Sequence, residues 1–322
     1  MKKKQIIKNV IFGAIALGLI WLLLSQISLK SLFETLKNAD IQLLFVGFVL
    51  YAITYLFRTF RFKALLNDSI NVNNLFKIVS LHALLNNLIP ARLGELSFVY
   101  FTKKIGNIKS AQSISVLIIC RVMDFTVSLI IFSIALLNIG EIPSIMSSIL
   151  KIMSVFLLLM IMLLFILIFT RYNIHKIAFR FCNLLKIDHY RFISFLLAKI
   201  KEIIEEIKNI KSNKKMVQVI IYSILIWASF LTSFYFIILS LNMQISLWII
   251  MIAFIFLMWA SILPIHSFGG FGTSEGAWAI AMIALGTGKE QAIISGFSVH
   301  ILMYVFVIIL CIFAIPILRK IK

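Results

Sequence analysis

Long apolar runs separated by short polar or basic segments dominate this chain. Full-length runs cover residues 10–24, 41–57, 111–137, 152–170, 216–239 and 247–263, and two more apolar pieces cover 277–285 and 292–318. A helix of about 20 apolar residues crosses the roughly 30 Å hydrocarbon core of a bilayer. The runs do not alternate as the strands of outer-membrane barrels do. The pattern therefore predicts an all-α polytopic membrane protein of about 6–8 transmembrane helices, in a single domain over residues 1–322.

Charged residues orient these spans. The segment 58–109 holds eight Lys or Arg against two Asp or Glu, and the segment 171–216 holds eleven against four. Segments 138–144 and 240–246 carry almost no charge. Because Lys and Arg collect in cytoplasmic loops, we expect a cell (inner) membrane protein with both termini in the cytoplasm. Residues 171–216 then form a basic, amphipathic connector between a first half (1–170) and a second half (217–322).

Composition narrows the function classes. The chain of 322 residues is 62% hydrophobic and only 13% charged, with a net charge of +19. A soluble domain carries about 25% charged residues, so a water-soluble enzyme is excluded. Anionic lipid at the cytoplasmic face accounts for the positive charge, and we expect no nucleic acid partner. Scattered cysteines and the absence of an HExxH or a phosphate-binding loop predict neither metal nor cofactor, and the oligomeric state stays open.

Two segments have apolar composition but broken helical patterns, at about residues 75–100 and 262–286. In each, an apolar stretch meets a proline, then glycine and a glutamate that opens another apolar stretch. The predicted hinge residues are Pro90 and Gly94 in the first segment, and Pro264, Gly269, Gly270 and Gly272 in the second. Broken backbone is tolerated at membrane depth only where protein or a water-filled cavity meets its polar groups. We therefore expect two re-entrant helical hairpins, compatible with an inverted pseudo-repeat that builds a site at the midplane.

Charged and polar side chains near these breaks are the candidate substrate-binding residues. Arg92 is the best anion ligand, because a planar guanidinium matches phosphate. Arg121 and Asp124 stand at i and i+3, either as a self-neutralising pair or facing a cavity. Glu95 and Glu275 each precede an apolar helix. Each glutamate can therefore either cap the N-terminus of that helix or take part in binding substrate or protons. The full candidate set is Asn87, Arg92, Glu95, Arg121, Asp124, Thr273, Ser274 and Glu275.

The broken segments carry a family resemblance. Residues 87–95, Asn-Leu-Ile-Pro-Ala-Arg-Leu-Gly-Glu, resemble the N-x-x-P-x-R-x-G-E signature of the lysylphosphatidylglycerol synthase transmembrane (flippase-like) family. Pro264 followed by Gly-Gly-Phe-Gly-Thr-Ser-Glu at 269–275 is similar to its second signature. Arg58 and Arg61 also occupy expected places. The chain departs from the usual pattern at Cys120, Phe98 and His300, where the family often has glutamate, arginine and arginine.

The resemblance implies a lipid flippase or another lipid-handling membrane protein. In full-length members this region precedes a soluble aminoacyl-transfer domain, but here the chain stops at Lys322. We therefore expect no synthetase activity and no other enzymatic activity. The expected substrate is an anionic phospholipid or a polyprenyl-phosphate-linked lipid, held by Arg92 and Arg121. The acidic residues Glu95, Asp124 and Glu275 would position those arginines or take up protons.

Two other function classes fit the same sequence. The chain can be a membrane scaffold or regulator for a separate lipid- or glycan-modifying enzyme, docked through the basic segment 171–216. It can also be an ion-coupled transporter of a small solute, which would need an enclosed cavity. The sequence does not choose among these classes.

Overall fold

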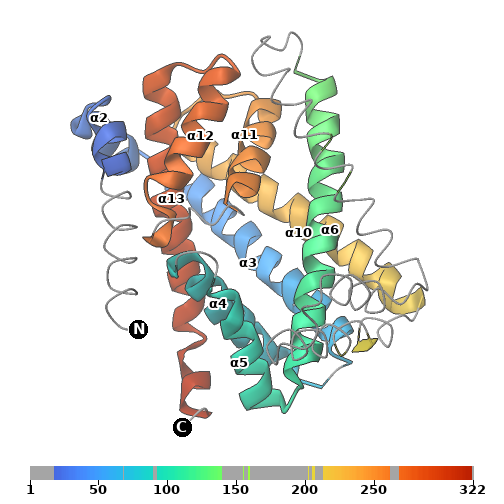
Figure 1. Cartoon of the computed structure of the whole chain (residues 1–322). Coiled ribbons are helices and arrows are strands. Elements are labelled where there is room, and N and C mark those ends of the chain that lie inside the picture. Colours follow the sequence, from blue (N-terminus) through green and yellow to red (C-terminus); the bar gives the residue numbers. More distant parts are fainter. Residues whose placement is uncertain are drawn as a thin grey trace, which may run out of the picture.

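A computed structural model of the chain describes residues 18–67, 69–89, 93–139, 213–261 and 268–320, together with residues 155, 159, 202, 205 and 206. Every regular element within these residues is a helix, as Figure 1 shows. The first half contributes α2 (Leu29–Lys37), α3 (Ile41–Leu65), α4 (Val72–Leu88), α5 (Glu95–Gly106) and α6 (Ser110–Leu137). The second half contributes α10 (Asn213–Ser240), α11 (Leu247–Ala260), α12 (Thr273–Ala284) and α13 (Lys289–Ile312), with short 3-10 turns at Phe268–Gly270 and Ile315–Lys320.

Four of the described helices are long and apolar enough to cross a bilayer: α3, α6, α10 and α13. A fifth crossing is present if Gly18–Leu24 and α2, which are bent by 83° relative to each other, count as one span. The all-α polytopic prediction is thus confirmed. The predicted spans at 10–24 and 152–170 lie largely outside the described residues, as does most of the connector 171–216.

One predicted span is shorter than expected. We expected a full crossing over residues 247–263, but α11 has only 14 residues and ends at Ala260. The N–H of Ser261 caps the helix end by donating to the carbonyls of Leu257 and Trp259. Pro264 follows closely in the sequence, and the residue before a proline disfavours helical backbone. Apolar composition alone did not reveal this stop.

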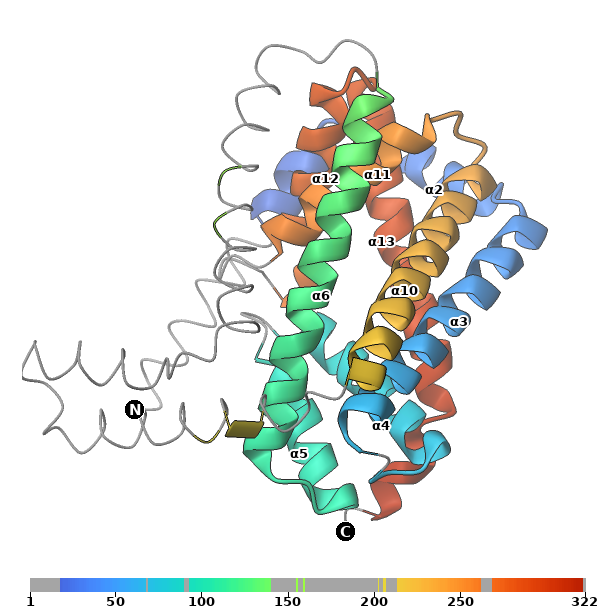
Figure 2. The same ribbon diagram turned by 90° about the vertical axis from the view of Figure 1, so that its right-hand side faces the viewer.

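The two halves repeat one order of elements. Each has a long helix, two short helices and a second long helix: α3, α4, α5 and α6 in the first half, and α10, α11, α12 and α13 in the second. In Figures 1 and 2 the pair α4–α5 lies toward the end that holds the C-terminus, and the pair α11–α12 lies toward the opposite end. The short pairs therefore occupy opposite ends of the bundle.

Corresponding helices of the two halves run in opposite directions. The backbone N–H of Asp40, before α3, donates to the carbonyl of Ser240, the last residue of α10, at 2.8 Å. At the other end of the same pair, Lys215 donates to the side chain of Asn67. Among the described helices, α3 and α10 make the most extensive contact. The halves thus pack through equivalent antiparallel helices, as an inverted repeat would.

Small and hydroxyl-bearing residues allow α3 and α10 to approach closely. The hydroxyl of Ser233 donates to the Gly47 carbonyl at 2.7 Å, and the hydroxyls of Thr54 and Ser229 are hydrogen-bonded at 2.9 Å. A Cβ on Gly47 would lie 3.4 Å from the Ile237 side chain. Without a hydrophobic force between helices in lipid, close packing and such hydrogen bonds hold membrane helices together. This seam fixes the relative position of the two halves.

Candidate functional site

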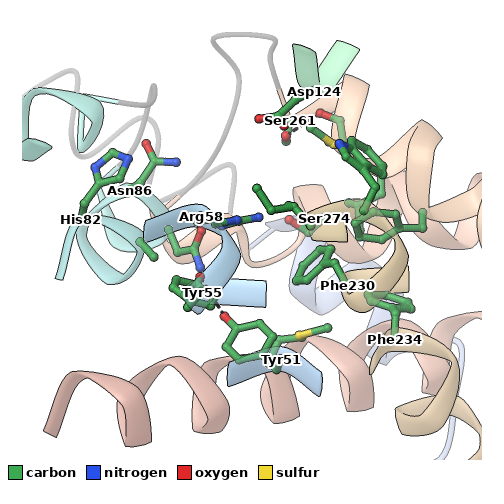
Figure 3. A pocket seen from close by; sticks show the side chains of 18 of the residues that line it. Tyr51, Tyr55, Arg58, His82, Asn86, Asp124, Phe230, Phe234, Ser261 and Ser274 are labelled. Carbon is green, nitrogen blue, oxygen red and sulfur yellow. Dashed lines mark hydrogen bonds between the residues drawn. The ribbon is translucent and has the colours of Figure 1, made fainter. Parts of the chain in front are cut away.

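A cavity of about 300 Å³ lies between the two halves. Residues from α3, α4 and α6 line one part of it, and residues from α10, α11, α12 and α13 line the rest. Figure 3 shows tyrosines and phenylalanines beside polar side chains around this space. The basic lining residues with a permanent charge are Arg58, Arg61 and Arg121.

The first arginine, Arg61, is buried in a charge-neutral cross-link. Its Nη1 donates to Asp124 Oδ1 at 2.6 Å and its Nη2 to Asp124 Oδ2 at 3.2 Å. Nη1 also donates to the Ser223 hydroxyl at 3.0 Å. Only 2% of Arg61 is exposed, and such a bidentate pair is both strong and directional. The pair therefore joins α3, α6 and α10 and fixes one wall of the cavity.

The second arginine, Arg121, pairs with Glu95. Its Nη2 lies 2.5 Å from Glu95 Oε1. Arg121 and Asp124, adjacent on one helix face, thus bind partners on α5 and α3, and not each other. A self-neutralising i, i+3 pair is not the arrangement found. Glu95 stands at the first position of α5 and links that helix to α6.

The turn between α4 and α5 is tightly packed. A Cβ at Gly94 would overlap the backbone of Leu85 and Asn86, so only glycine fits against the last turns of α4. The hydroxyl of Ser97 donates to the Gly94 carbonyl at 2.6 Å and lies 3.2 Å from His82 Nδ1. Asn86, Asn87 and His82 line the cavity beside this turn. Pro90 and Arg92 lie outside the described residues, so their predicted roles stay predictions.

The corresponding turn of the second half is built on glycine. Gly269, Gly270 and Gly272 have φ of 63°, 71° and 82°, a left-handed backbone that glycine adopts without steric cost. The N–H of Gly272 donates to Glu275 Oε2 at 2.7 Å. The Thr273 hydroxyl donates to the Gly270 carbonyl at 3.0 Å. Glu275 therefore does cap α12; a hinge motion at these glycines stays a prediction, and Pro264 lies outside the described residues.

Glu275 has a second partner, His300 of α13. His300 Nδ1 lies 2.6 Å from Glu275 Oε1. The imidazole packs 4.6 Å from the Phe271 ring and 5.1 Å from the Tyr304 ring, centroid to centroid. Tyr304 donates its hydroxyl to the Gly269 carbonyl at 2.8 Å. Helix α13 thus contacts the turn before α12 through Tyr304 and the first turn of α12 through His300.

The structure brings part of the predicted site together at the cavity. Asn87, Arg121, Asp124 and Ser274 line it. Glu95 and Glu275 instead contact bases that line it, Arg121 and His300. The described residues contain no group of three His, Cys, Asp or Glu placed to hold a metal ion.

Sequence reasoning missed Arg58 as a site residue. Arg58 lies one turn before Arg61, and its guanidinium carbon is 5.0 Å from the Tyr55 ring centroid and 5.5 Å from that of Phe230. In the sequence, Arg58 stands among basic residues that end an apolar run, a pattern typical of cytoplasmic loops. The only sequence signal was that Arg58 precedes Arg61 by three residues, which places the two arginines on one face of a helix. That spacing does not show that this face lines a cavity; only the tertiary structure does.

The three departures from the family pattern have distinct surroundings. Phe98 is fully buried and packs against the rings of Phe62 and His82, with centroids 4.5 Å and 5.6 Å away. Cys120 is buried in the cavity wall. His300 keeps a contact with Glu275 but supplies an imidazole where the family often has a guanidinium.

A family model described as lysylphosphatidylglycerol synthase TM region matches residues 9–311. The chain belongs to this family. No curated protein and no solved structure is significantly similar to the chain. Family membership identifies a multi-pass membrane protein linked to lipid handling, and the matched transmembrane region contains no evident catalytic domain.

Proposed function

We propose that this family member moves an anionic amphiphile, a phospholipid or a polyprenyl-phosphate-linked lipid, between the leaflets of the cell membrane. The observation that carries the proposal is the cavity of about 300 Å³ between two inverted halves, lined by three arginines. This volume is near the lower limit of about 300–1,000 Å³ for ligand pockets. Acyl chains can stay in the bilayer during transfer, so the cavity needs to hold only a headgroup.

The positions of the short helices support an alternating mechanism. The pairs α4–α5 and α11–α12 lie at opposite ends of the bundle, and both contribute residues to the cavity. In transporters built from inverted repeats, rocking one half against the other exposes a central site to each side in turn. We propose that the two short pairs are re-entrant hairpins that open and close in this way. Arg92 would join the site from the segment between α4 and α5.

The lysine-rich end of the bundle is proposed to face the cytoplasm. Lys63 lies near the end of α3, Lys103 and Lys104 in the last turn of α5, and Lys215 near the start of α10. These helix ends lie toward the end that holds the C-terminus in Figures 1 and 2. The positive-inside rule assigns such an end to the cytoplasm, where anionic lipid headgroups would contact it.

Headgroup accessibility in proteoliposomes tests lipid transfer. Purified protein is reconstituted with a fluorescent phosphatidylglycerol, and an impermeant quencher reports the fraction of headgroups in the outer leaflet over time. A parallel arm uses a fluorescent polyprenyl phosphate, and each arm is run with and without a proton gradient. We expect wild-type protein to expose protected lipid faster than protein-free vesicles in at least one arm. Protein-free rates in all arms would contradict the proposal.

A cavity-filling variant ties the activity to the site. Met258 lines the cavity from α11, whereas Phe256 on the same helix does not. Met258→Trp adds bulk inside the cavity and should slow transfer, and Phe256→Trp should leave the rate close to that of wild type. Equal rates for both variants would show that lipid moves by another route.

The same vesicles separate the alternatives raised by the sequence. Uptake of a soluble solute without lipid transfer would favour the ion-coupled solute transporter. A scaffold for a separate lipid- or glycan-modifying enzyme would transfer nothing in vesicles. Its function would instead be lost when the lysines of residues 171–216 are replaced by glutamine.

A further inference from the structure

Helix α2 carries apolar side chains on one side and charged side chains on the other. The apolar side chains follow the i, i+3, i+4, i+7 spacing of a single helix face: Leu29, Leu32, Phe33 and Leu36. Lys30 and Glu34 lie away from this face and form an exposed ion pair with a separation of 3.8 Å. The spanning helices α3, α6, α10 and α13 separate apolar from polar residues far less.

The rest of the protein covers only half of the apolar face of α2. Leu32 and Leu36 are partly buried against the hydrophobic core, and α2 contacts α13. Leu29 and Phe33 are 61% and 68% exposed, and they are neighbours on the helix surface because they stand four residues apart. Helix α2 therefore has one side against the bundle, one exposed apolar side and one charged side.

The chain makes a sharp bend before α2. The apolar helix that precedes α2 is inclined to it by 83°. The hydroxyl of Ser25 and the Nε2 of Gln26 donate to the carbonyl of Leu22 at 2.9 Å and 2.8 Å, a group that the end of a helix leaves unpaired. On the other side of the bend, Ser28 caps α2 by accepting from the N–H of Ser31. These side chains stabilise a direction of α2 that lies across the preceding apolar helix.

Helix α2 lies at the level where neighbouring spans end. The side chain of Asn242, after α10, donates to the carbonyl of Asn38, after α2, at 3.2 Å, and α3 begins at Ile41. Figure 1 shows α2 toward the end of the bundle opposite the C-terminus. On the preceding helix, Trp21 is 73% exposed, and tryptophan is enriched where a bilayer meets water. The exposed apolar side of α2 therefore continues the apolar surface of a span at interfacial depth.

We propose that α2 is an interfacial helix, with Leu29 and Phe33 inserted among the acyl chains of the outer leaflet and with Lys30 and Glu34 in water. Amphipathic helices of this kind lie in the plane of the interface. The inference does not require lipid transfer; only the choice of leaflet rests on the proposed cytoplasmic position of the lysine-rich end. The partner is the apolar part of the lipid, because Lys30 and Glu34 are paired and Lys37 alone adds charge.

Spin labels on the full chain in lipid nanodiscs test the contact with lipid. Phe33→Cys and Lys30→Cys report the two exposed sides, in a background that carries Cys182→Ser; Cys120 and Cys311 are buried. Molecular oxygen concentrates in the acyl region, whereas a nickel chelate stays in water. We expect the ratio of oxygen to nickel collisions to be several-fold higher at Phe33→Cys than at Lys30→Cys. Nanodiscs of phosphatidylcholine and of phosphatidylglycerol should give the same difference.

A charged side chain on the apolar side should detach the helix from the lipid. With the label at Leu29→Cys, Phe33→Glu should lower the collision ratio toward that of Lys30→Cys, because a carboxylate is costly among acyl chains. Lys37→Glu places the same carboxylate at another exposed position of α2 and should leave the ratio as it was. An equal response to both substitutions would contradict insertion of the apolar side.

Three further results would overturn the contact with lipid. Equally low ratios at Phe33→Cys and Lys30→Cys would place α2 in water. Exclusion of both reagents from Phe33→Cys would show that protein, such as a second copy of the chain, covers this side. A difference seen only in phosphatidylglycerol would show that charge and not apolar area holds the helix.

Thiol labelling in spheroplasts of an expression host tests the leaflet separately. We expect an impermeant maleimide to label Lys30→Cys in intact spheroplasts and Lys103→Cys, on the lysine-rich end, only after lysis. The reverse result would overturn the outer-leaflet assignment and the proposed topology together. The collision ratios and the lipid-transfer rate are measured independently, so failure of either proposal can be recognised without the other.

Discussion

Each half of the molecule contains an acid at the start of a short helix that binds a base on the next long helix. Glu95 binds Arg121 over a separation of 26 residues, and Glu275 binds His300 over 25. In the first pair the two side chains are 28% and 30% exposed, whereas in the second Glu275 is 0% and His300 17% exposed. The two halves therefore contain equivalent acid–base pairs, but the pair of the first half is partly exposed and that of the second half is largely buried.

The difference in burial changes how many hydrogen-bond partners each carboxylate needs from the protein. A buried carboxylate needs a partner for each oxygen, and Glu275 has one in the N–H of Gly272 and one in His300. Glu95 is partly exposed, so part of its solvation can remain. Exposed pairs contribute little net stability, but breaking a buried pair leaves an uncompensated group. We therefore expect the second turn to be held firmly and the first to move more easily.

The largest effect should come from the buried pair that joins α3 to α6, Arg61–Asp124. Asp124→Ala should lower the free energy of unfolding by about 3–5 kcal/mol, because it leaves the Arg61 charge buried and unpaired. Denaturant unfolding of the purified protein in detergent measures this. Glu34→Ala, which removes an exposed partner of Lys30, serves as the control. A loss no greater than that of the control would show that burial does not determine the strength of these pairs.

The second largest loss of stability should come from Glu275, whose buried side chain caps α12 in the second half. Glu275→Ala should lower the free energy of unfolding by about 1–3 kcal/mol for the groups left unsatisfied. Glu275→Gln should be milder, because an amide oxygen can still accept from Gly272. The same unfolding measurement applies. If Glu275→Ala were as stable as Glu95→Ala, the contrast between the two turns would disappear.

The matching change in the first half should cost less. We expect Glu95→Ala to lower the free energy of unfolding by about 1 kcal/mol or less, because the pair is partly exposed. Lipid transfer should nevertheless slow, since Arg121 loses the group that positions it at the cavity. Stability and transfer rate measured on one preparation test this. A stability loss larger than that of Glu275→Ala would reverse the comparison.

Much of the fold could be predicted from the sequence because it depends on local composition. The apolar runs that form α3, α6, α10 and α13 are so long that they predict membrane-spanning helices directly. The glycine-rich turn before α12 was predicted as a bend, because few other residues adopt its backbone conformation. The length of α11 was overestimated, since hydropathy averages over residues and does not register where a helix stops.

The candidate site could be predicted only in part. Asn87, Arg121, Asp124 and Ser274 were identified because polar groups within apolar runs are rare, and all four line the cavity. Their partners were not identified, because Arg61 and Asp124 stand 63 residues apart. Arg58 was missed for the same reason: nothing nearby in the chain distinguishes a loop arginine from one stacked on the ring of Phe230, a residue of another helix.

The sequence by itself determined the membrane character, the long helices, the two breaks and the family. These follow from properties of contiguous residues: hydrophobicity over about 20 positions, the backbone limits of proline and glycine, and motifs of fixed spacing. Only the tertiary structure decided which acid neutralises which base and which arginine remains without an ion pair among the described residues. Electrostatic partners are selected by distance in space and by burial, and helix packing brings together residues that the chain keeps far apart.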